Sequence, residues 1–429
     1  MRAAIISIGD ELMLGQTIDT NTAWLSAELA ARGIVTIEHR TIGDDRAALG
    51  ETVRRLASKV DLLILTGGLG PTADDLTREA LADALTPGQA LVRDAAAVTR
   101  LERWFSTHGS GMPKSNLKQA DRPPGTQLLA NPHGTALGIS GQLGACRVFA
   151  LPGPPAEMMP MLLEQVLAAF ERPVSGDVVL TEAVYAYGLG ESAGAERLGS
   201  LMDRDREPLV GTTVSESILT ARIVARGPQA PARRELDRTM AVVKEKWHPF
   251  VFGCANESLA SAVGELLRAG HRTLTTVESC TGGLLGKMIV DVAGSSDYYL
   301  GGWVPYTNEL KQSCLAVPGA VLTEHGAVSE PTARALAEGA LKASGADYSL
   351  AITGIAGPDG ETADKPLGTV FIGLGQVIEG NVRVVVRQFA FPGDRRAVRD
   401  RSAKSALQML RFTLLGVSDD THLLWAVHP

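Results

Sequence analysis

Two nucleophilic side chains, Ser279 and Cys280, stand next to each other in the segment TVESCTGG. The preceding residues, HRTLTTV, have the composition of a strand, and the following residues have that of a helix. A strand that leads directly into a helix exposes a side chain beside free backbone N–H groups, which can stabilise an oxyanion or a phosphate. Gly282 and Gly283 lack a Cβ atom, so a substrate can approach the backbone there. A helix cap in a tight turn, without catalysis, is the ordinary alternative.

The base for either nucleophile has two candidate sources. Cysteine hydrolases commonly pair the thiol with a histidine; His271 begins the strand and should lie at its far end, whereas His325 stays open as a partner. The segment PYTNELK offers Tyr306 and Lys311 instead. A lysine in a dry site has a lowered pKa, and its neutral form can accept the serine proton while a tyrosine hydroxyl relays or positions it. A solvated lysine at a helix start is the ordinary alternative.

The composition limits the classes of function. The chain has 429 residues, enough for two or three domains, of which 45% are hydrophobic and 21% charged. Its net charge of −7 argues against a general nucleic-acid binder, which needs a basic surface. No apolar run approaches the roughly 20 residues of a membrane span, and the first residues are typical of a strand. The four cysteines are scattered along the chain, which favours a reducing cytoplasm. The sequence has no HExxH motif, which argues against a zinc site formed by the protein alone.

The order of predicted elements indicates an α/β protein with three domains. We place a doubly wound N-terminal domain at 1–170, a small α+β connecting domain at 171–253, and a C-terminal α/β domain at 254–417, followed by a tail at 418–429. In the first domain, strands and helices alternate as in a parallel sheet covered on both faces. Its predicted strands are 3–9, 34–40, 61–68 and 146–153, and its predicted helices are 23–33, 46–58, one from about 74, and 154–170.

The other two domains carry fewer regular signals. The connecting domain has strand-like runs at 178–188 and 217–227 and a helix-like run at 233–247, without a catalytic constellation. The tail has no clear assignment. In the C-terminal domain we expect helices at 258–270, 282–294 and from 395, strands at 271–277, 347–354 and 368–375, and a loop at 304–311.

Five ordered motifs in the last domain carry a family resemblance. ESCTGGLLGKMIVDVAGSS, YTNELK, HGAVSEPTA, ITGIAGPDG with KPLGTV, and FPGDRRAVR resemble the C-terminal domain of the CinA family, an amidohydrolase that deamidates nicotinamide mononucleotide. The resemblance implies that Ser279 is the nucleophile, that Tyr306 and Lys311 assist it, and that Ser296 is a further active-site position. The family's frequent GPDGG ends in Glu361 here, which leaves the nearby loop geometry open and touches none of these groups.

The chemistry implied by this resemblance is acyl transfer to serine without a cofactor. Backbone N–H groups of the glycine-containing run 353–360 are suited to an anion such as the substrate phosphate. Arg395 and Arg399 lie one helical turn apart and could face the same pocket, although a solvated helix face explains that spacing equally well. The expected substrate-binding set is Cys280, Thr281, Gly282, Gly283, Ser296, Thr353, Gly354, Gly357, Arg395 and Arg399.

A second set of motifs lies in the first domain. GDELMLGQTIDTN, TIGDD, TGGLGPTADDLTRE, NPHGTALGI and LPGPPAEM resemble the other half of the CinA family, which shares the molybdopterin-binding, MoaB/MogA-like fold. The match reaches about Glu164, and ALG replaces the more usual APG. The resemblance implies a metal-dependent ADP-ribose pyrophosphatase, but a shared fold does not choose between diphosphate hydrolysis and pterin binding.

The residues of these motifs suit that chemistry. The loop 67–70 follows a buried strand and can bring N–H groups to a diphosphate. Carboxylates near it, together with substrate oxygens, could hold Mg²⁺, Mn²⁺ or Co²⁺, although Asp44 or Asp45 and Asp74 or Asp75 could simply cap helices. The expected nucleotide-binding set is Asp10, Glu11, Asn21, Gly67, Gly68, Gly70 and Thr72, and the expected metal ligands are Asp44, Asp74 and Asp75.

Taken together, the cysteine usage favours the cytoplasm, and the resemblance implies a homodimeric enzyme of pyridine-nucleotide salvage with two activities. It would deamidate nicotinamide mononucleotide and hydrolyse ADP-ribose to AMP and ribose 5-phosphate, with neither nucleic acid nor membrane as a partner. Two alternatives stay open. In one, the first half binds a pterin or nucleotide without turnover; in the other, the protein is a non-enzymatic accessory in competence or DNA damage.

Overall fold

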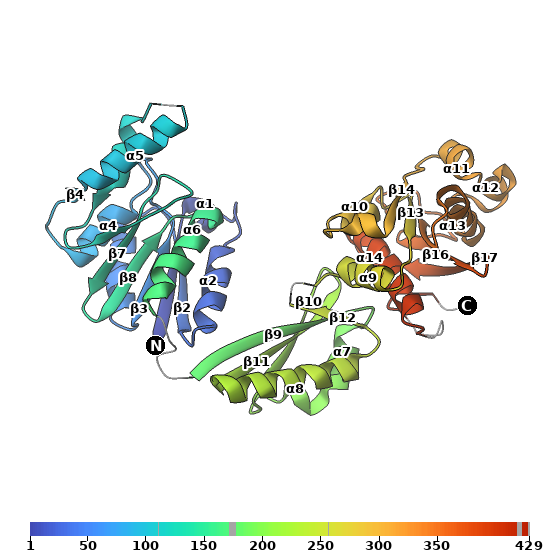
Figure 1. The fold of residues 1–429 in the computed structure, drawn as a ribbon, viewed down its shortest axis with the longest axis horizontal. Helices are drawn as coiled ribbons and strands as arrows, with labels where there is room; N and C mark the ends of the chain where they lie inside the picture. Colours follow the sequence, from blue (N-terminus) through green and yellow to red (C-terminus); the bar gives the residue numbers. More distant parts are fainter. Residues whose placement is uncertain (110, 171–176, 256, 418–422, 428–429) are drawn as a thin grey trace. The chain divides into compact units, whose positions relative to one another are not determined.

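The computed structural model describes residues 1–109, 111–170, 177–255, 257–417 and 423–427 (Figure 1). Contacts within the chain group into two units. One contains Met1–Leu180 with Ala225–Arg234, and the other contains Thr181–Val224 with Glu235–Pro429. Most of the predicted connecting domain therefore belongs to the same unit as the C-terminal domain. The predicted boundary at 171–176 and the tail residues 418–422 and 428–429 lie outside the described residues.

A six-stranded sheet with the order β2-β1-β3-β8-β7-β6 forms the centre of the first part of the chain. The first four strands in that order are parallel to one another, and β7 and β6 add as antiparallel strands. This arrangement confirms the predicted α/β class. The strands are β1 (Arg2–Ile8), β2 (Val35–Ile42), β3 (Leu62–Thr66), β6 (Gln127–Leu129), β7 (Gly138–Leu143) and β8 (Cys146–Leu151).

Helices cover both faces of this sheet (Figure 1). α2 (Asn21–Ala30) and α6 (Pro155–Met161) pack on one face through a core that includes Leu25, Leu29 and Met158. α3 and α4 pack on the other face. Every residue of β3 is buried, as expected for a strand between two helical layers. The remaining elements are α1 (Asp10–Met13), α3 (Arg46–Ala57), α4 (Thr77–Leu85), β4 (Val92–Arg93), α5 (Ala95–Thr107) and β5 (Asp121–Arg122).

Two helix predictions for this part differ from the structure. The helix expected from about residue 74 begins at Thr77, because the Asp75 carboxylate turns back to accept N–H groups of the preceding loop. The helix expected over 154–170 is an α-helix only as far as Met161 and continues as a wider π-helical turn over Leu162–Val166. Pro160 lies at this change and has no N–H for the helical bond ladder.

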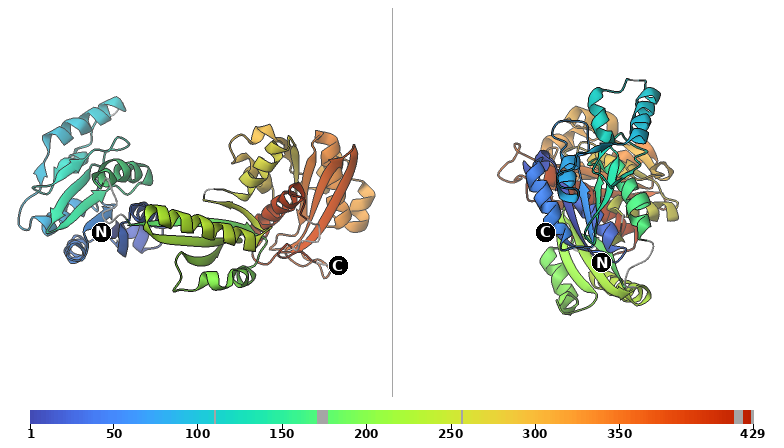
Figure 2. Two further views of the ribbon diagram at one scale, coloured as in Figure 1. Left: turned by 60° about the horizontal axis from the view of Figure 1, so that its bottom comes forward. Right: turned by 90° about the vertical axis from the view of Figure 1, so that its left-hand side faces the viewer.

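The connecting domain is a four-stranded sheet with the order β10-β11-β9-β12. Helix α8 lies along this sheet (Figure 2). Its last residue, Trp247, is fully buried and donates to Gly194 O at 2.9 Å. The predicted small α+β unit is thus confirmed. Its elements are β9 (Asp177–Tyr187), α7 (Glu191–Leu198), β10 (Leu209–Ser215), β11 (Ile218–Pro228), α8 (Gln229–Trp247) and β12 (Val251–Cys254).

The C-terminal domain contains a five-stranded sheet with the order β14-β13-β15-β16-β17. β13 is parallel to both of its neighbours, and β16 and β17 are antiparallel additions. α11 to α13 share an apolar core with one face of the sheet, and Figure 1 shows α9 and α14 on the other. The strands are β13 (Leu274–Glu278), β14 (Tyr299–Trp303), β15 (Tyr348–Gly354), β16 (Thr369–Ile378) and β17 (Asn381–Ala390). The helices are α9 (Leu259–Ala269), α10 (Leu284–Val290), α11 (Asn308–Leu315), α12 (Gly319–His325), α13 (Glu330–Ser344) and α14 (Arg395–Leu414).

Close packing of α11 is the feature of this domain that matters most for function. A Cβ atom at Gly339 of α13 would lie 2.2 Å from Leu315 O at the end of α11, so glycine permits the close contact of the two helices. The predicted loop 304–311 is a loop only through Thr307, whose side chain accepts the Leu310 N–H and caps α11. Lys311 therefore lies in the first turn of a helix. Within the described residues, no helix is both long and apolar enough to span a membrane.

Candidate active sites

The serine lies where β13 ends and the chain turns toward α10. Ser279 N donates to Ile352 O of β15 at 3.0 Å, so the sheet fixes the start of the turn. Gly282 and Gly283 follow with φ of 59° and 90°, a left-handed conformation that favours glycine. The predicted strand-to-helix position of Ser279 is therefore what the structure shows, and its side chain is part-exposed.

Lys311 brings an amine to this serine. It is 1% exposed, and its Nζ lies 3.4 Å from Ser279 Oγ. The same Nζ donates to the carbonyl oxygens of Pro305 at 3.0 Å and Tyr306 at 3.4 Å. Within the described part of the chain its hydrogen-bond partners are therefore all uncharged. Burial lowers the pKa of the Lys311 amine, which favours the neutral form that can accept a proton.

Cys280 occupies a different environment from its neighbour. Its side chain is 6% exposed, and burial raises the pKa of the thiol to about 12. A thiol that stays protonated is a poor nucleophile. The local environment thus favours Ser279 as the reactive group of the pair.

Glu278 holds the start of α10 in place. This carboxylate is 1% exposed and accepts the N–H groups of Leu285 at 2.9 Å and Gly286 at 2.7 Å. These are helix N-terminal donors of the kind that we expected a substrate to use. Among the described backbone hydrogen bonds, none is donated by Cys280 or Thr281, so the N–H groups next to the serine are the ones left for an oxyanion. Glu278 is part of the serine motif, yet its sequence context predicted no role for it.

Two arginines of α14 reach the loops around the serine. Arg399 donates twice to Thr281 O, at 3.2 and 2.6 Å, and Arg395 donates to Gly357 O at 2.7 Å. Arg395 also approaches the Tyr306 hydroxyl at 3.3 Å. The helical spacing thus places both arginines at the same group of loops, as one of the two sequence interpretations expected. The Tyr306 side chain is 57% exposed, and the described contact of its hydroxyl is with this arginine.

The other predicted residues of this site have mainly structural contacts. Thr353 is buried, and its hydroxyl donates to Ala327 O at 2.6 Å. Gly354 ends β15, where a Cβ atom would lie 2.6 Å from Val370. Ser296 is exposed in a short 3₁₀ turn before β14. These contacts leave a direct role in substrate binding as a prediction for all three.

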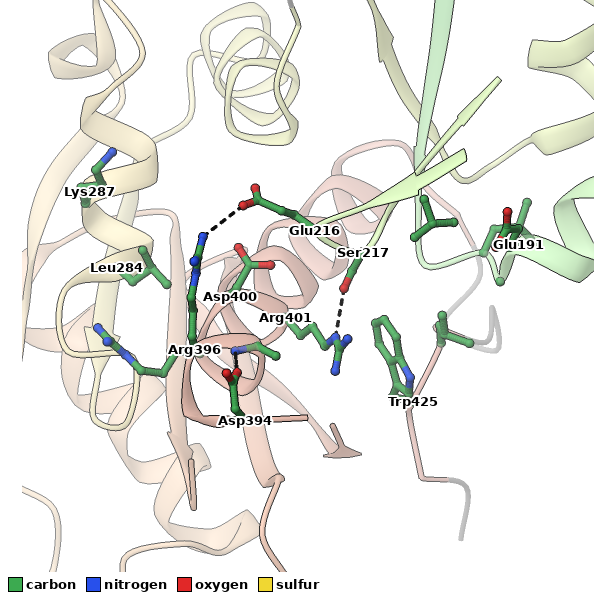
Figure 3. Close-up of a pocket in the computed structure, with 16 residues that line it drawn as sticks. Glu191, Glu216, Ser217, Leu284, Lys287, Asp394, Arg396, Asp400, Arg401 and Trp425 are labelled. Atoms are coloured by element: carbon green, nitrogen blue, oxygen red, sulfur yellow. Dashed lines mark hydrogen bonds and ion pairs between the residues drawn. The ribbon is translucent and has the colours of Figure 1, made fainter. Parts of the chain in front are cut away.

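A large cavity in the second unit does not surround the serine. It has a volume of about 920 Å³ and lies beside the first turns of α14 (Figure 3). Figure 3 shows that Arg396 pairs with Glu216 at 3.4 Å and that Arg401 donates to Ser217 Oγ at 2.9 Å. These contacts attach the β10–β11 turn to α14, which also carries Arg399. Because these arginines contact groups of the protein itself, the contacts do not indicate which ligand the cavity would bind.

A smaller pocket, of about 390 Å³, lies over the glycine-rich loop in the first unit. Residues 67–72 form one wall, and Glu11, Asp44 and Asp74 contribute to the others. Thr77 Oγ1 at the start of α4 donates to Gly67 O at 2.9 Å and fixes the loop from behind. The structure therefore brings the predicted loop to one pocket with four of the predicted carboxylates, whereas the predicted Asp10 and Asn21 are not among the lining residues. The four are Glu11, Asp44, Asp74 and Asp75.

Asp75 occupies N–H groups that we expected a diphosphate to use. Its carboxylate accepts from Gly70 N at 2.7 Å, from Thr72 N at 2.8 Å and from the Thr72 hydroxyl. Gly67 N donates to a carbonyl of β8. Within the described backbone bonds, Gly68 N is left without such a partner. Asp75 thus holds its own loop in place. Of the predicted glycines, Gly68 is the one whose N–H is available to bind a phosphate in the described structure.

Negative charge gathers around Asp44. Its carboxylate accepts the Asp10 N–H at 3.1 Å, and Asp10 accepts the Asp44 N–H at the same distance. Burial raises the pKa of Asp44, and the charges of Asp10, Glu11 and Asp74 raise it further. Of the two neighbours Asp44 and Asp45, it is Asp45 that caps the helix α3. Among the described residues, no three His, Cys, Asp or Glu side chains are arranged to hold a metal ion by themselves.

Two further residues matter for this pocket, one behind its wall and one in its lining. Asn21 Nδ2 donates to Gly153 O at 2.7 Å and Thr66 Oγ1 at 3.2 Å, so it braces the loop after β8. Glu157 lines the pocket and accepts from Asn131 Nδ2 at 2.6 Å. Glu157 belongs to the motif LPGPPAEM but was not predicted as a site residue; its place in the first turn of a helix after a strand was the available signal.

Comparison with known proteins identifies the family. A putative competence-damage inducible protein of Moorella thermoacetica is 40% identical over 413 residues, which are 96% of this chain and 98% of the relative. The chain belongs to the CinA family. A CinA-like protein of Gemmatimonas aurantiaca is 39% identical over 99% of each chain. The crystal structure of a CinA superfamily protein from Klebsiella pneumoniae is 34% identical, covers 37% of this chain and 96% of its own, and has a TM-score of 0.35.

Three family patterns divide this CinA-family chain. The probable molybdopterin binding domain matches residues 4–172, the damage-inducible protein CinA KH domain matches 182–253, and the CinA C-terminal domain matches 256–414. The recognised resemblance and the fold class are thus confirmed, with the middle part now assigned as a KH-type domain. The relatives' names state no reaction.

We expect the thiols of this CinA-family protein to differ in reactivity. Burial raises the pKa of Cys280 to about 12 and that of Cys146 to about 11, whereas Cys314 is exposed. Iodoacetamide at neutral pH should therefore modify Cys314 and spare Cys280 and Cys146, as measured by peptide mass spectrometry. Unfolded protein, in which every thiol should react, is the control. Modification of Cys280 as fast as Cys314 would contradict the described environment.

Proposed function

We propose that the C-terminal domain is a serine amidase that converts nicotinamide mononucleotide into nicotinic acid mononucleotide and ammonia. The observation that supports this most is the contact between the buried Lys311 amine and Ser279 Oγ, at 3.4 Å. That distance is long for a hydrogen bond, but catalytic contacts often shorten when substrate binds. The family to which the chain belongs is consistent with this activity, and it is the residues that suggest the mechanism.

In the proposed mechanism, Lys311 transfers one proton in each half of the reaction. Ser279 Oγ attacks the carboxamide carbon while its proton passes to the neutral Lys311 Nζ. The tetrahedral intermediate expels ammonia, which takes that proton, and an ester on Ser279 remains. Water then attacks the ester, and Lys311 accepts a proton from it. Lys311 returns this proton to Ser279 Oγ as the ester bond breaks, so the acid is released and Ser279 is restored. The N–H groups of Cys280 and Thr281 are the donors available to the oxyanion.

The phosphate of the substrate would lie near the two arginines of α14. Arg395 and Arg399 use some of their donors on Gly357 O and Thr281 O. A guanidinium has five N–H donors, so each arginine retains others for a phosphate. The arginines would then have two tasks, because they hold the loops around the serine in place and provide positive charge for the phosphate.

We expect Ser279→Ala to lose nicotinamide mononucleotide deamidation by several orders of magnitude, because it removes the nucleophile. Cys280→Ala should retain substantial activity, since the buried thiol is protonated. Ammonia release from purified protein measures both. The opposite pattern, with Ser279→Ala active and Cys280→Ala inactive, would transfer the nucleophile to the thiol.

The pH dependence should reveal the base. Only the neutral Lys311 amine accepts a proton, so kcat/KM should rise with pH through the lowered pKa of Lys311 and level off above it. Lys311→Arg should be inactive across the whole range, because a guanidinium stays charged. Lys287→Met, which changes an exposed lysine paired with Asp291, is the matched control and should keep the wild-type profile. Wild-type rates in Lys311→Arg would rule out the lysine base.

For the N-terminal domain we propose hydrolysis of ADP-ribose to AMP and ribose 5-phosphate. The pocket combines a glycine-rich loop with the carboxylates around Asp44, a donor set that suits a hard divalent cation. The described carboxylates do not complete such a site alone, so diphosphate oxygens would have to supply further ligands. When bound, the metal would lower the pKa of water and offset phosphate charge. Pterin or nucleotide binding without turnover is the competing interpretation.

A pair of neighbouring substitutions separates these two interpretations. Asp44→Asn should raise the concentration of Mg²⁺, Mn²⁺ or Co²⁺ needed for AMP release, because it removes a charge from the pocket. Asp45→Asn should leave that requirement unchanged, since asparagine also caps a helix. AMP is measured by chromatography, and a chelator should abolish its release from wild-type protein. Release that does not need a metal would remove the proposed metal requirement, and no release at all would remove the proposed hydrolysis.

A further inference from the structure

A buried guanidinium lies directly behind the glycine-rich loop. Arg78 is 0% exposed and donates to Leu69 O at 2.5 Å and to Gly70 O at 3.2 Å. Its Nε has no hydrogen-bond partner in the described structure. Burial lowers the pKa of Arg78 to about 10, which still leaves the group charged at neutral pH. The loop is thus held from behind by a full positive charge whose hydrogen-bond acceptors are neutral carbonyls.

The carboxylates around Arg78 contact other groups, although one oxygen of Glu79 is buried without a hydrogen-bond partner in the described structure. Glu79, Asp75 and Asp121 are the carboxylates whose charges raise the pKa of Arg78. Glu79 pairs with a lysine at 3.4 Å, and Asp121 pairs with an arginine at 2.7 Å. Asp75 accepts three donors of its own loop. Within the described residues, the guanidinium therefore has no carboxylate in direct ion-pair contact, which is unfavourable for a charge in a protein interior.

The loop presents few donors of its own to an anion. Thr77 and Arg78 hold the carbonyls of residues 67–70 toward α4. Asp75 and β8 occupy the N–H groups of Gly70 and Gly67. In the described part of the loop, the N–H groups of Gly68 and Leu69 have no backbone partner and provide only partial charges, so positive charge from elsewhere, in addition to the proposed metal, would strengthen the binding of a diphosphate.

We propose that Arg78 is the built-in counter-charge for an anionic diphosphate bound over this loop, and that it acts through the loop without touching the ligand. This inference rests on the proposed binding of a diphosphate by the N-terminal domain. Arg78 is then a positioning residue with an electrostatic effect, and a bound anion adds to the negative charge that Glu79, Asp75 and Asp121 already provide. The carbonyl contacts orient the loop, and the charge sets the affinity.

The chain contains a matched control for the purely structural part of this role. Arg411 of α14 is 9% exposed and donates to Pro249 O at 2.9 Å and also to Val251 O. Burial lowers its pKa to about 10 as well. Arg411 thus resembles Arg78 in burial and carbonyl contacts, but it belongs to the other unit, far along the chain from the glycine-rich loop.

The test compares charge with hydrogen bonding at one position. Binding of inorganic pyrophosphate with Mg²⁺ is measured by calorimetry on the full chain, with thermal unfolding as the fold control. Arg78→Gln keeps carbonyl donors without the charge and should weaken binding at least about tenfold and reduce its dependence on salt. Arg78→Lys keeps the charge and should bind within about threefold of wild type. Arg411→Gln should lower the unfolding temperature and leave the affinity unchanged.

A substitution of opposite sign covers the case in which Arg78→Gln does not fold. Glu79→Gln removes the nearest negative charge from a part-exposed position and should tighten pyrophosphate binding. Equal affinities in wild type, Arg78→Gln and Glu79→Gln would overturn the counter-charge, as would equally weak binding by Arg78→Lys and Arg78→Gln. If wild-type protein binds no pyrophosphate and hydrolyses no ADP-ribose, the proposed function of this domain fails first.

Discussion

Burial of one lysine among uncharged hydrogen-bond partners is the constraint on which the C-terminal site depends; it lowers the pKa of Lys311 although the charge of Glu309 acts in the opposite direction. A carboxylate beside Lys311 would hold its amine in the protonated form, and the group would lose its use as a base. The described hydrogen-bond partners of the amine are instead two carbonyls and the Ser279 hydroxyl. Lys311 is buried on the same helix, α11, that packs closely against α13 at Gly339, so this packing helps to hold the helix that carries the lysine.

The loops around this amine come from distant parts of the domain, and α14 joins them. Arg399 holds the turn after Ser279, and Arg395 holds the Gly357 loop and approaches Tyr306. The same helix is attached to the β10–β11 turn of the KH-type domain through Arg396 and Arg401. Residues on different faces of α14 therefore contact the loops of the site and the neighbouring domain. The site and that domain both depend on the position of α14.

Much of the fold could be predicted from sequence because its signals are local. Buried apolar runs and helix boundaries gave β1, β3, β15 and α14 within a few residues. The residues alone left the base open between a histidine and Lys311, and it was the family resemblance that implied the pairing of Ser279 with Lys311. Strand β14, with the sequence YLGGW, was missed because its two glycines hide the alternating pattern.

The roles of acidic residues were the part that sequence could not provide. Glu278 and Asp75 lie in motifs that suggest catalysis or metal binding, yet both satisfy backbone N–H groups of their own turns. Whether a carboxylate faces a ligand or its own backbone depends on side-chain direction, which spacing along a helix or loop does not fix. The same limit applies to Arg78, whose burial follows from the packing of α4 under the loop and not from its neighbours in sequence.

The position of Glu278 has a consequence for the end of a catalytic cycle. Its carboxylate neutralises the positive end of α10, where an acid formed from an amide would otherwise find strong donors. A newly formed carboxylate gains nothing there and is repelled by the buried negative charge. If the proposed amidase activity holds, the acid product would therefore not be retained by the N–H groups at the start of α10.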